Sequence, residues 1–541
     1  MPALSDLREA LEAAAAAIGG DAVPPSNRLT LERPKKAGFG DYATNAAMLL
    51  APVLGEPPRA IAEKLGASLQ ARLGDRVEKV EVAGPGFLNL FLSDAWYVGA
   101  VRDVLDAGDR YGAGEQDERI QVEFVSANPT GPLTAASGRH AAFGDALARI
   151  LELAGNTVER EYYFNDGGGQ VRRLGESILA RARGEEPPED GYQGEYVADV
   201  AERIPGAAGL SPDELAAKGI EILMAGIRDT LDRYRVRFDH WFLERSLYEG
   251  SPSAWEEARA KLLAENHAYE SEGALWLRTT ALAGDEKDRP LVKSNGEPTY
   301  LAADVAYHWD KLHRGFDRLV NVLGSDHHGY VVRLKAIIAA EGADPDRLII
   351  PLLQFVHVVE GGERASMSKR RGDFVTLSEL IEEIGVDATR FFMLSRSADS
   401  TVDLDLTLAK EQSRENPVYY VQYAHARMSK ILRDAGEERV HAALAADDGG
   451  LALEPAEREL VKKLLAFPAL VEEAADRYAP HLVAVYALEL AQTFTAYYRD
   501  CPILKAEDEA LGSFRLATTV ATRRVVARSL DLLGVSAPET M

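Results

Sequence analysis

The sequence predicts an α/β protein: a Rossmann-type parallel-sheet domain, preceded by a small α/β N-terminal domain and followed by an all-helical C-terminal domain. Two strand–loop–helix–strand units, near residues 119–164 and 318–359, indicate the parallel sheet, because such units join parallel strands through a right-handed crossover. From about residue 408 the apolar pattern becomes almost wholly helical, which indicates a separate domain.

The N-terminal domain is expected to span residues 1–112. The helical spacing of Leu4, Leu7 and Leu11 predicts a first helix, and Gly19-Gly20 ends it as glycines past a helix end do. A turn-rich segment around residue 112 then separates this unit from the first strand of the next domain.

The first strand–helix–strand unit begins where apolar and polar residues alternate, at 119–125. After a polar loop, helical spacing predicts a helix at 143–154, and a second strand follows at 157–164. Small residues in the loop, from Ala135 to Gly138, let a ligand approach the backbone, and the first turn of the following helix suits a phosphate. Tight packing alone also explains such a loop.

The second unit has a buried strand at 318–323, a loop at 324–329, a helix at 330–340 and a further strand at 348–359. Ligands of open α/β sheets bind beyond the carboxyl ends of the strands, so both loops are expected to face one cleft.

The catalytic domain is expected to span residues 113–407, with an insertion at about 184–290, and the helical domain residues 408–541. A Pro- and Glu-rich linker at 184–194 opens the insertion, and Asn295-Gly296 predicts a hairpin turn after it.

Charge and composition exclude several classes of protein. The chain has 541 residues, with 61 Lys and Arg against 86 Asp and Glu, a net charge of −25. This excludes a uniformly basic nucleic-acid coat, although a local basic groove stays open. The single cysteine, Cys501, excludes a disulfide framework and a Cys-rich zinc site. No export signal is visible, and the apolar runs fall short of the roughly 20 residues that span a bilayer, so we expect a cytoplasmic protein without membrane contact.

A second loop with candidate catalytic residues lies at 364–373. There Lys369 stands beside Ser368 in a glycine-bounded segment, and its ammonium group can donate to phosphate oxygens and offset charge that builds at phosphorus. Taken alone, it could equally be a basic surface loop.

Ordered matches along nearly the whole chain resemble the class I aminoacyl-tRNA synthetases, and among them the arginyl-tRNA synthetase family. The matching segments are 38–45, 84–89, 124–133, 162–166, 238–242, 300–304, 324–329, 366–370, 387–390, 423–427 and 532–539. Ser366-Met367-Ser368-Lys369-Arg370 resembles the second signature of the class, and Asp387-Ala388-Thr389-Arg390 resembles the motif that names the anticodon-binding domain.

The resemblance implies an arginine–tRNA ligase that uses ATP with Mg²⁺ and no zinc. Arginine would be activated to arginyl-adenylate and then transferred to the 3′-terminal adenosine of its tRNA. The N-terminal domain would be the additional tRNA-binding domain, the helical domain would bind the anticodon, and the protein would be a monomer.

The resemblance also assigns residues to four roles. The catalytic positions are Lys369, Ser368, Thr134, Ser137 and His140. ATP would be bound by Pro129, Gly131, Leu133, Gly138, Gly324, Asp326, His327, Met367 and Arg370. Arginine would be bound by Glu123, Ser126, Asn128, Tyr300, Asp304 and His328. The tRNA would contact Phe87, Asn89, Tyr419, Tyr423 and Arg427.

The chemistry of these side chains agrees with the assignment. A guanidinium is a planar cation with five donors, so its pocket needs a carboxylate and a flat partner. Tyr300 and Asp304 lie one turn apart at the start of a predicted helix and would share a face, although a first-turn acid beside a packed tyrosine would look the same. The sequence Asp326-His327-His328 invites a metal interpretation, which we disfavour because three consecutive side chains do not easily converge on one ion.

One departure bears on activity. Where the family has His-x-Gly-His, this chain has Thr134-Ala135-Ala136-Ser137, so both signature histidines are missing. The hydroxyls of Thr134 and Ser137 can still donate, and His140 is a candidate substitute. Ser366 also replaces the first lysine of the second signature, while Lys369 remains. We expect an active variant.

Three alternatives stay open. The first is a synthetase paralogue that binds tRNA or arginine with weak or no adenylation, because Thr134 and Ser137 replace the signature histidines. The second is a synthetase for another amino acid, which the Tyr300 and Asp304 pair disfavours. The third is a nucleotidylyltransferase outside the synthetases, which the helical C-terminal third disfavours.

Overall fold

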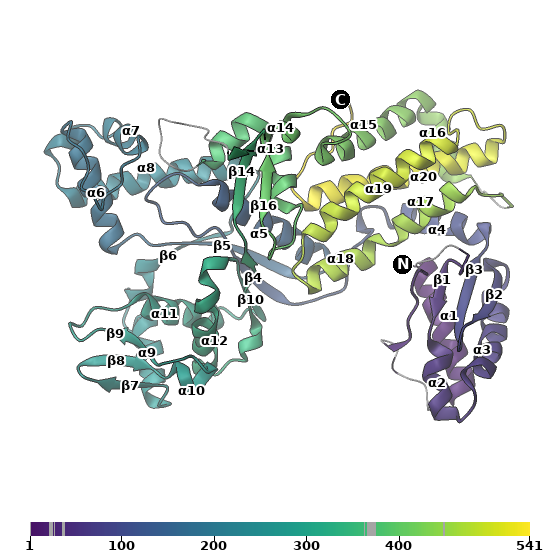
Figure 1. Cartoon of the computed structure of the whole chain (residues 1–541), viewed down its shortest axis with the longest axis horizontal. Helices are drawn as coiled ribbons and strands as arrows, with labels where there is room; N and C mark the ends of the chain where they lie inside the picture. The colour runs from purple at the N-terminus through teal and green to yellow at the C-terminus, as the bar shows by residue number, and fades with distance from the viewer. Residues whose placement is uncertain are drawn as a thin grey trace.

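The computed structural model describes residues 2–20, 25, 28–34, 38–361, 363–364, 375–446 and 450–541. The N-terminal domain and the C-terminal helices lie at one end of an elongated molecule, the parallel sheet lies in the middle, and the inserted helices α6–α8 lie at the other end (Figure 1). Within the described residues, no helix combines the length and apolar character needed to cross a membrane.

The N-terminal domain packs four helices against a small antiparallel sheet. Its helices are α1 (Pro2–Gly19), α2 (Ala46–Leu54), α3 (Pro58–Leu73) and α4 (Asp94–Ala107). Its strands, in the order β1-β3-β2, are β1 (Tyr42–Thr44), β3 (Phe87–Leu92) and β2 (Val77–Ala83). The predicted first helix is confirmed, and Leu7 and Leu11 on its apolar face are buried in the core.

The central sheet has five strands, all parallel, in the order β12-β10-β4-β5-β6. They are β12 (Leu348–Ile349), β10 (Arg318–Asn321), β4 (Arg119–Glu123), β5 (Thr157–Phe164) and β6 (His240–Leu243). The chain runs outward from β4 to β6 and then returns to β10 and β12, which is the Rossmann strand order. The order reverses between β4 and β10, and Glu123 and Asn321 lie opposite each other at the carboxyl ends of these strands.

The crossover helices α5 (Ala135–Leu153) and α12 (Val331–Ala340) confirm both predicted units. Helix α5 begins earlier than the periodicity predicts, because Thr134 caps it by accepting the backbone N–H of Ser137 at 3.3 Å. The small residues of its first turns serve close packing: a side chain at Gly138 would lie 2.7 Å from Leu377, and one at Gly144 would lie 2.1 Å from Phe124.

Two predicted strands are shorter in the structure. The segment 348–359 is not one strand but three, β12, β13 (Leu352–Leu353) and β14 (Val356–Glu360), which lie in three different sheets. Pro351 stands between the first two, and proline has no amide with which to continue a ladder. The strand predicted at 119–125 ends at Glu123, because Val125 and Ser126 take positive φ angles of 67° and 41°.

Short strands extend the carboxyl side of the sheet. Strand β13 pairs with β11 (Leu323–Gly324), and β14 pairs with β15 (Glu363–Arg364) and with β16 (Val402–Asp405). Helix α13 (Leu377–Leu394) and the short helix α14 (Leu406–Lys410) lie in the same region.

The chain between β5 and β10 forms two separate groups of helices and strands rather than one continuous insertion. Helices α6 (Gly168–Ala182), α7 (Tyr196–Glu202) and α8 (Pro212–Arg233) come first, and β6 then returns to the sheet inside the range expected for the insertion. The second group contains α9 (Ala254–Ala264), β7 (Ala268–Ser271), β8 (Ala274–Leu277), α10 (Thr279–Ala283), β9 (Arg289–Val292) and α11 (Tyr300–His313). The predicted turn at Asn295-Gly296 is confirmed, because Gly296 donates to the Lys293 carbonyl at 2.9 Å with a φ of 84°.

The C-terminal region is helical, as predicted. It contains α15 (Pro417–Ala435), α16 (Glu437–Ala445), α17 (Pro455–Leu465), α18 (Phe467–Asp476), α19 (His481–Asp500) and α20 (Glu509–Leu532). Helix α17 contacts the N-terminal domain through charged pairs, among them Arg458 with Asp94 at 2.6 Å and Lys462 with Asp41 at 2.7 Å.

Candidate functional site

A cavity of about 390 Å³ lies at the carboxyl ends of β4 and β10, and residues of helix α11 also line it. Carboxylates and tyrosines dominate its wall. The polar side chains that line it are Glu123, Asn128, Tyr163, Asn165, Glu244, Tyr300, Asp304, Tyr307, His308, Asn321, His327 and Tyr330. The strand-order reversal of an α/β sheet is where such folds bind ligands, so this cavity is the candidate site.

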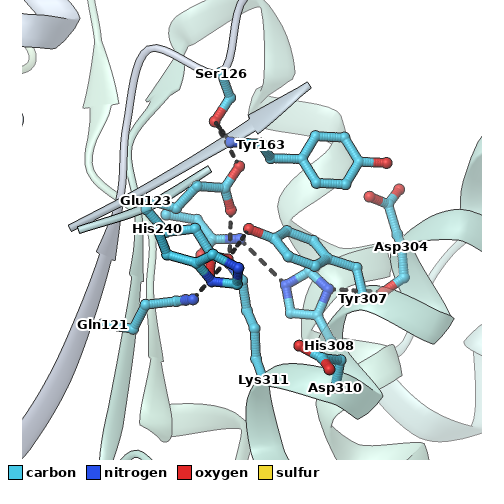
Figure 2. A network of polar contacts seen from close by, with 12 residues as sticks. Gln121, Glu123, Ser126, Tyr163, His240, Asp304, Tyr307, His308, Asp310 and Lys311 are labelled. Atoms are coloured by element: carbon cyan, nitrogen blue, oxygen red, sulfur yellow. Dashed lines mark hydrogen bonds and ion pairs between the residues drawn. The ribbon is translucent and has the colours of Figure 1, made fainter. Parts of the chain in front are cut away.

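Glu123, at the end of β4, is held from two sides (Figure 2). Its Oε1 accepts the Ser126 hydroxyl at 2.9 Å, and its Oε2 accepts the Lys311 ammonium at 2.6 Å. The positive φ angles of Val125 and Ser126 turn the chain back so that Ser126 can reach this carboxylate. Such strained backbone at the end of a strand is common at functional sites.

Asp304 faces the same cavity from the first turns of α11. Its carboxylate accepts the Tyr330 hydroxyl. Burial, with the nearby carboxylates Glu123 and Glu244 as smaller causes, raises the pKa of Asp304 to about 7, against the lowering effect of the hydrogen bond from Tyr330. Near neutral pH the carboxyl group is therefore partly protonated, and a cation bound beside it would favour its ionised form.

Glu244 adds a third acid to the wall. It accepts the Tyr163 hydroxyl at 2.6 Å, and burial raises its pKa above the ordinary value. Several carboxylates in one partly closed cavity, with tyrosine rings beside them, favour a cationic and flat ligand over a neutral or anionic one.

The affinity of this cavity for a ligand that carries a guanidinium group is expected to depend on pH through Asp304. The raised pKa near 7 means that the carboxyl group is protonated below pH 7 and must release its proton when a guanidinium binds. The dissociation constant should thus rise by up to about tenfold per pH unit below pH 7 and stay level above about pH 8. Titration calorimetry between pH 5.5 and 8.5 would measure it, and a flat profile would contradict the assignment.

The segment of the first signature, near residues 133–137, lies beside residues 375–377, which follow the second signature in the chain. The Leu133 carbonyl accepts the Leu377 amide at 2.8 Å, and the Ala135 amide donates to the Val375 carbonyl at 2.9 Å. Thr134 and Ser137 stand together at the start of α5, with their hydroxyl oxygens 3.3 Å apart. The second-signature residues Met367, Ser368, Lys369 and Arg370 lie outside the described residues.

Other residues assigned to ATP have packing roles visible in the structure. Leu133 is buried, and Gly138 provides the space that Leu377 fills, while Gly131 packs beside the Tyr196 ring. Pro129 is buried as well. Any contact of these residues with a nucleotide would therefore use their main-chain groups.

His140, which the sequence assigns to catalysis, has an uncharged imidazole. Burial lowers the pKa of His140 to about 4, with the neighbouring Arg139 as the next cause, so the imidazole is neutral at neutral pH. It can donate a hydrogen bond but does not supply a positive charge. Arg139 itself is buried and donates to the carbonyls of Gln354, Ser397 and Ser400 at 2.6–2.9 Å, which joins α5 to the segments around β14 and β16.

The turn after β11 is a short 3₁₀ helix, Ser325–Tyr330, in which Asp326, His327 and His328 are exposed. His327 lines the cavity, whereas His328, assigned to arginine, is not among the lining residues. A side chain at Gly324 would lie 2.4 Å from an Asp326 carboxylate oxygen, so the exposed Asp326 side chain would have to move to admit one.

A different cluster has the spacing of metal ligands, namely Glu159, Glu161 and His240. Arg314 already occupies it: one of its terminal nitrogens lies 3.0, 2.6 and 3.0 Å from the three. Glu161 is correspondingly held ionised, because hydrogen bonds from His240 and Arg314 lower its pKa to about 2 against the opposing effect of burial. The cluster is an internal ion-pair network.

The residues assigned to tRNA differ in exposure. Tyr419 and Tyr423 stack on α15 with ring centroids 6.0 Å apart, and Arg427 lies over the Tyr423 ring at 4.7 Å. Tyr498 of α19, which the sequence did not single out, brings a further exposed ring 5.3 Å from the same guanidinium. In the N-terminal domain Phe87 is exposed, but Asn89 lies in the central strand and is only 5% exposed, so its side chain is not presented to a partner.

Sequence reasoning missed several residues of the cavity, chiefly Tyr163, Glu244, Tyr307 and His308, and it also missed Lys311, which is buried behind them. Those on α11 carried a signal: Tyr300, Asp304, His308 and Lys311 recur every three or four residues, which places them on one face of the helix. Tyr163 lies in β5 and Glu244 directly follows β6, and nothing local distinguishes them.

Comparison with known proteins shows which family this chain resembles. Three family profiles match in order: the arginyl tRNA synthetase N terminal domain at 5–92, the class I (R) tRNA synthetase catalytic domain at 213–410, and the DALR anticodon binding domain at 421–541. The arginine–tRNA ligase of Frankia alni is 46% identical over 99% of this chain and 100% of its own length. That of Solidesulfovibrio magneticus is 44% identical over 100% of both chains. The solved arginyl-tRNA synthetase of Thermus thermophilus superposes with a TM-score of 0.79 and 26% identity over 100% of both chains.

Proposed function

The chain belongs to the arginyl-tRNA synthetase family, the class I enzymes that ligate arginine to tRNA, and from this premise we propose that the cavity between β4, β10 and α11 is its arginine site. The observation that carries the proposal is the meeting of Glu123 and Asp304 in one cavity lined by tyrosines. These two carboxylates come from separate elements, and each suits one cationic end of arginine.

Glu123 and Asn128 would receive the α-ammonium group, with Ser126 assisting. Asp304 would pair with the guanidinium, and Tyr300, which is 74% exposed at the mouth, would lie against its flat face. This leaves the substrate carboxylate free to attack. His328 would contribute only by a rearrangement of its turn.

The reaction has two steps. An arginine carboxylate oxygen bonds to the α-phosphorus of ATP and pyrophosphate leaves, which gives arginyl-adenylate. A ribose hydroxyl of the terminal tRNA adenosine then bonds to the arginine carbonyl carbon and loses its proton, and AMP leaves.

Mg-ATP would bind between the start of α5 and the 3₁₀ turn at Ser325–Tyr330. The Ala135 and Ser137 amides in the first turn of α5 already donate within the protein, so the Thr134 and Ser137 hydroxyls would be the main donors to a phosphate there. Asp326 and His327 would contact the nucleoside. Lys369, with Ser368, Met367 and Arg370, would offset the charge that builds on the phosphates.

The tRNA would span the molecule. Tyr419, Tyr423 and Arg427 offer ring faces and a cation for unstacked anticodon bases. Phe87 would contact the body of the tRNA from the N-terminal domain. We retain the division into domains at 1–112, 113–407 and 408–541, and a monomeric, cytoplasmic enzyme, as parts of this proposal.

Arginine-dependent ATP–pyrophosphate exchange tests the function directly. The purified protein, with its tRNA present, is expected to exchange label with arginine and not with the other nineteen amino acids, because Asp304 and Glu244 favour a cationic side chain and the tyrosine rings beside them favour a flat one. Running the assay without tRNA shows whether activation waits for it. Retained tRNA binding with no exchange under either condition would instead indicate a paralogue that binds without activating.

A further inference from the structure

Lys311 is a buried lysine that lies behind the arginine site rather than in it. Its side chain is fully buried, and the described residues that line the cavity do not include it. The ammonium nitrogen lies 2.6 Å from Glu123 Oε2 and 2.9 Å from Asn321 Oδ1, and 4.2 Å from the centroid of the Tyr307 ring. An ammonium group has three N–H donors; two of them have oxygen acceptors here, and the Tyr307 ring lies beside the group.

The position of Lys311 is itself fixed through a chain of hydrogen bonds. The Asn321 amide nitrogen lies 3.2 Å from His308 Nε2, and His308 Nδ1 lies 2.8 Å from the Asp304 carbonyl oxygen. Burial lowers the pKa of His308 to about 3, so the ring is neutral, donates from Nδ1 and accepts at Nε2. Asn321 must then turn its oxygen toward Lys311.

Glu123 is consequently fixed at both oxygens, by Lys311 on one side and Ser126 on the other (Figure 2). A carboxylate offers about four acceptor positions, so two remain for a ligand in the cavity. Without these donors the carboxylate could rotate about its side-chain bonds, and its remaining lone pairs would no longer point at one place.

We propose that Lys311 and Ser126 are positioning residues that hold Glu123 in the orientation that binds the α-ammonium group of arginine. They thereby set the preference of the site for an amino acid over a guanidino acid without the amino group. The inference rests on the proposed function, in which Glu123 receives the α-ammonium.

A ligand that lacks only the α-amino group separates positioning from general support of the fold. 5-Guanidinopentanoate keeps the guanidinium, the chain and the carboxylate of arginine but makes no ammonium contact. Loss of Lys311 as a purely structural residue would weaken both ligands alike, whereas loss of Glu123 orientation would weaken arginine alone.

The experiment measures both dissociation constants by calorimetry on the full-length protein. In Lys311→Met, arginine is expected to bind about 10- to 100-fold more weakly, the usual cost of a lost charged hydrogen bond, while 5-guanidinopentanoate changes by less than about twofold. Lys311→Arg keeps the cation and should recover most of the arginine affinity. Lys430→Met, at an exposed lysine paired with Asp434, is the matched control and should change neither constant.

Ser126→Ala keeps the test valid if Lys311→Met does not fold, because it removes one donor from the edge of the site. Arginine should then weaken by about 3- to 10-fold and 5-guanidinopentanoate should not. Glu123→Gln distinguishes a failure of the role assigned to Glu123 from a failure of the positioning inference. If Glu123→Gln leaves the ratio of the two constants unchanged, the assigned role of Glu123 fails. If it changes the ratio but Lys311→Met and Ser126→Ala do not, only the positioning inference is overturned.

Discussion

Replacing Asp304 by asparagine is expected to lower kcat/KM for arginine in ATP–pyrophosphate exchange by about 100- to 1,000-fold, which corresponds to losing one desolvated charge pair. Asp304 lines the cavity and, in the proposed function, pairs with the guanidinium; the amide that replaces it keeps the shape but not the charge. The Tyr330 hydroxyl, which donates to Asp304, can still donate to an amide oxygen, so little rearrangement is expected.

The neutral analogue citrulline makes this prediction specific. Because citrulline has the shape of arginine without its side-chain charge, Asp304→Asn should reduce the preference for arginine over citrulline while the KM for ATP stays constant. Asp310→Asn is the control on the same helix, since Asp310 pairs with Arg314 at 3.0 Å and does not line the cavity. Equal losses for arginine and citrulline would place Asp304 outside direct recognition.

Replacing Arg390 by methionine is expected to destabilise the protein by about 3–5 kcal/mol, the usual cost of breaking one side of a buried ion pair. Arg390 is completely buried and donates to Asp145 at 2.5 Å, to the Leu533 carbonyl at 2.8 Å and to the Tyr234 carbonyl at 3.0 Å. Three elements far apart in sequence, α5, the end of α8 and the C-terminal tail, would each lose a partner.

The tail is fitted closely to this arginine. A side chain at Gly534 would lie 2.3 Å from the Arg390 guanidinium, and Asp387, one turn earlier in α13, receives the Ser536 amide at 3.0 Å. The motif Asp387-Ala388-Thr389-Arg390 is therefore a clamp that joins the C-terminal tail to the catalytic domain.

Thermal unfolding of Arg390→Met, followed by calorimetry, measures the effect. The chain has several domains, so the comparison should use the transition that changes rather than one overall free energy. Arg414→Met is the matched control, because the Arg414 side chain is 84% exposed and pairs only with its neighbour Glu415 among the described contacts. A shift no larger than that of the control would contradict the clamp.

Local sequence patterns predicted helices and strands well where the whole element has the same surroundings along its length. Strand β5 has the predicted bounds, and the crossover helices follow the predicted units, because burial on one face imposes a simple period. The predictions failed where the chain changes sheet within a few residues, as at Pro351, and where strained backbone ends a strand, as at Ser126. Both events depend on what lies beside the chain rather than on its periodicity.

The sequence by itself determined the family, the Rossmann-type sheet and the residues that stand at strand ends or on one face of a helix, such as Glu123, Tyr300 and Asp304. Only the tertiary structure decided that Lys311 lies against Glu123, which is 188 residues away, that Glu244 joins the same cavity, and that Asn89 is buried. The physical reason is that periodicity and capping act over a few residues, whereas the desolvation and pairing of charges depend on groups brought together from distant parts of the chain.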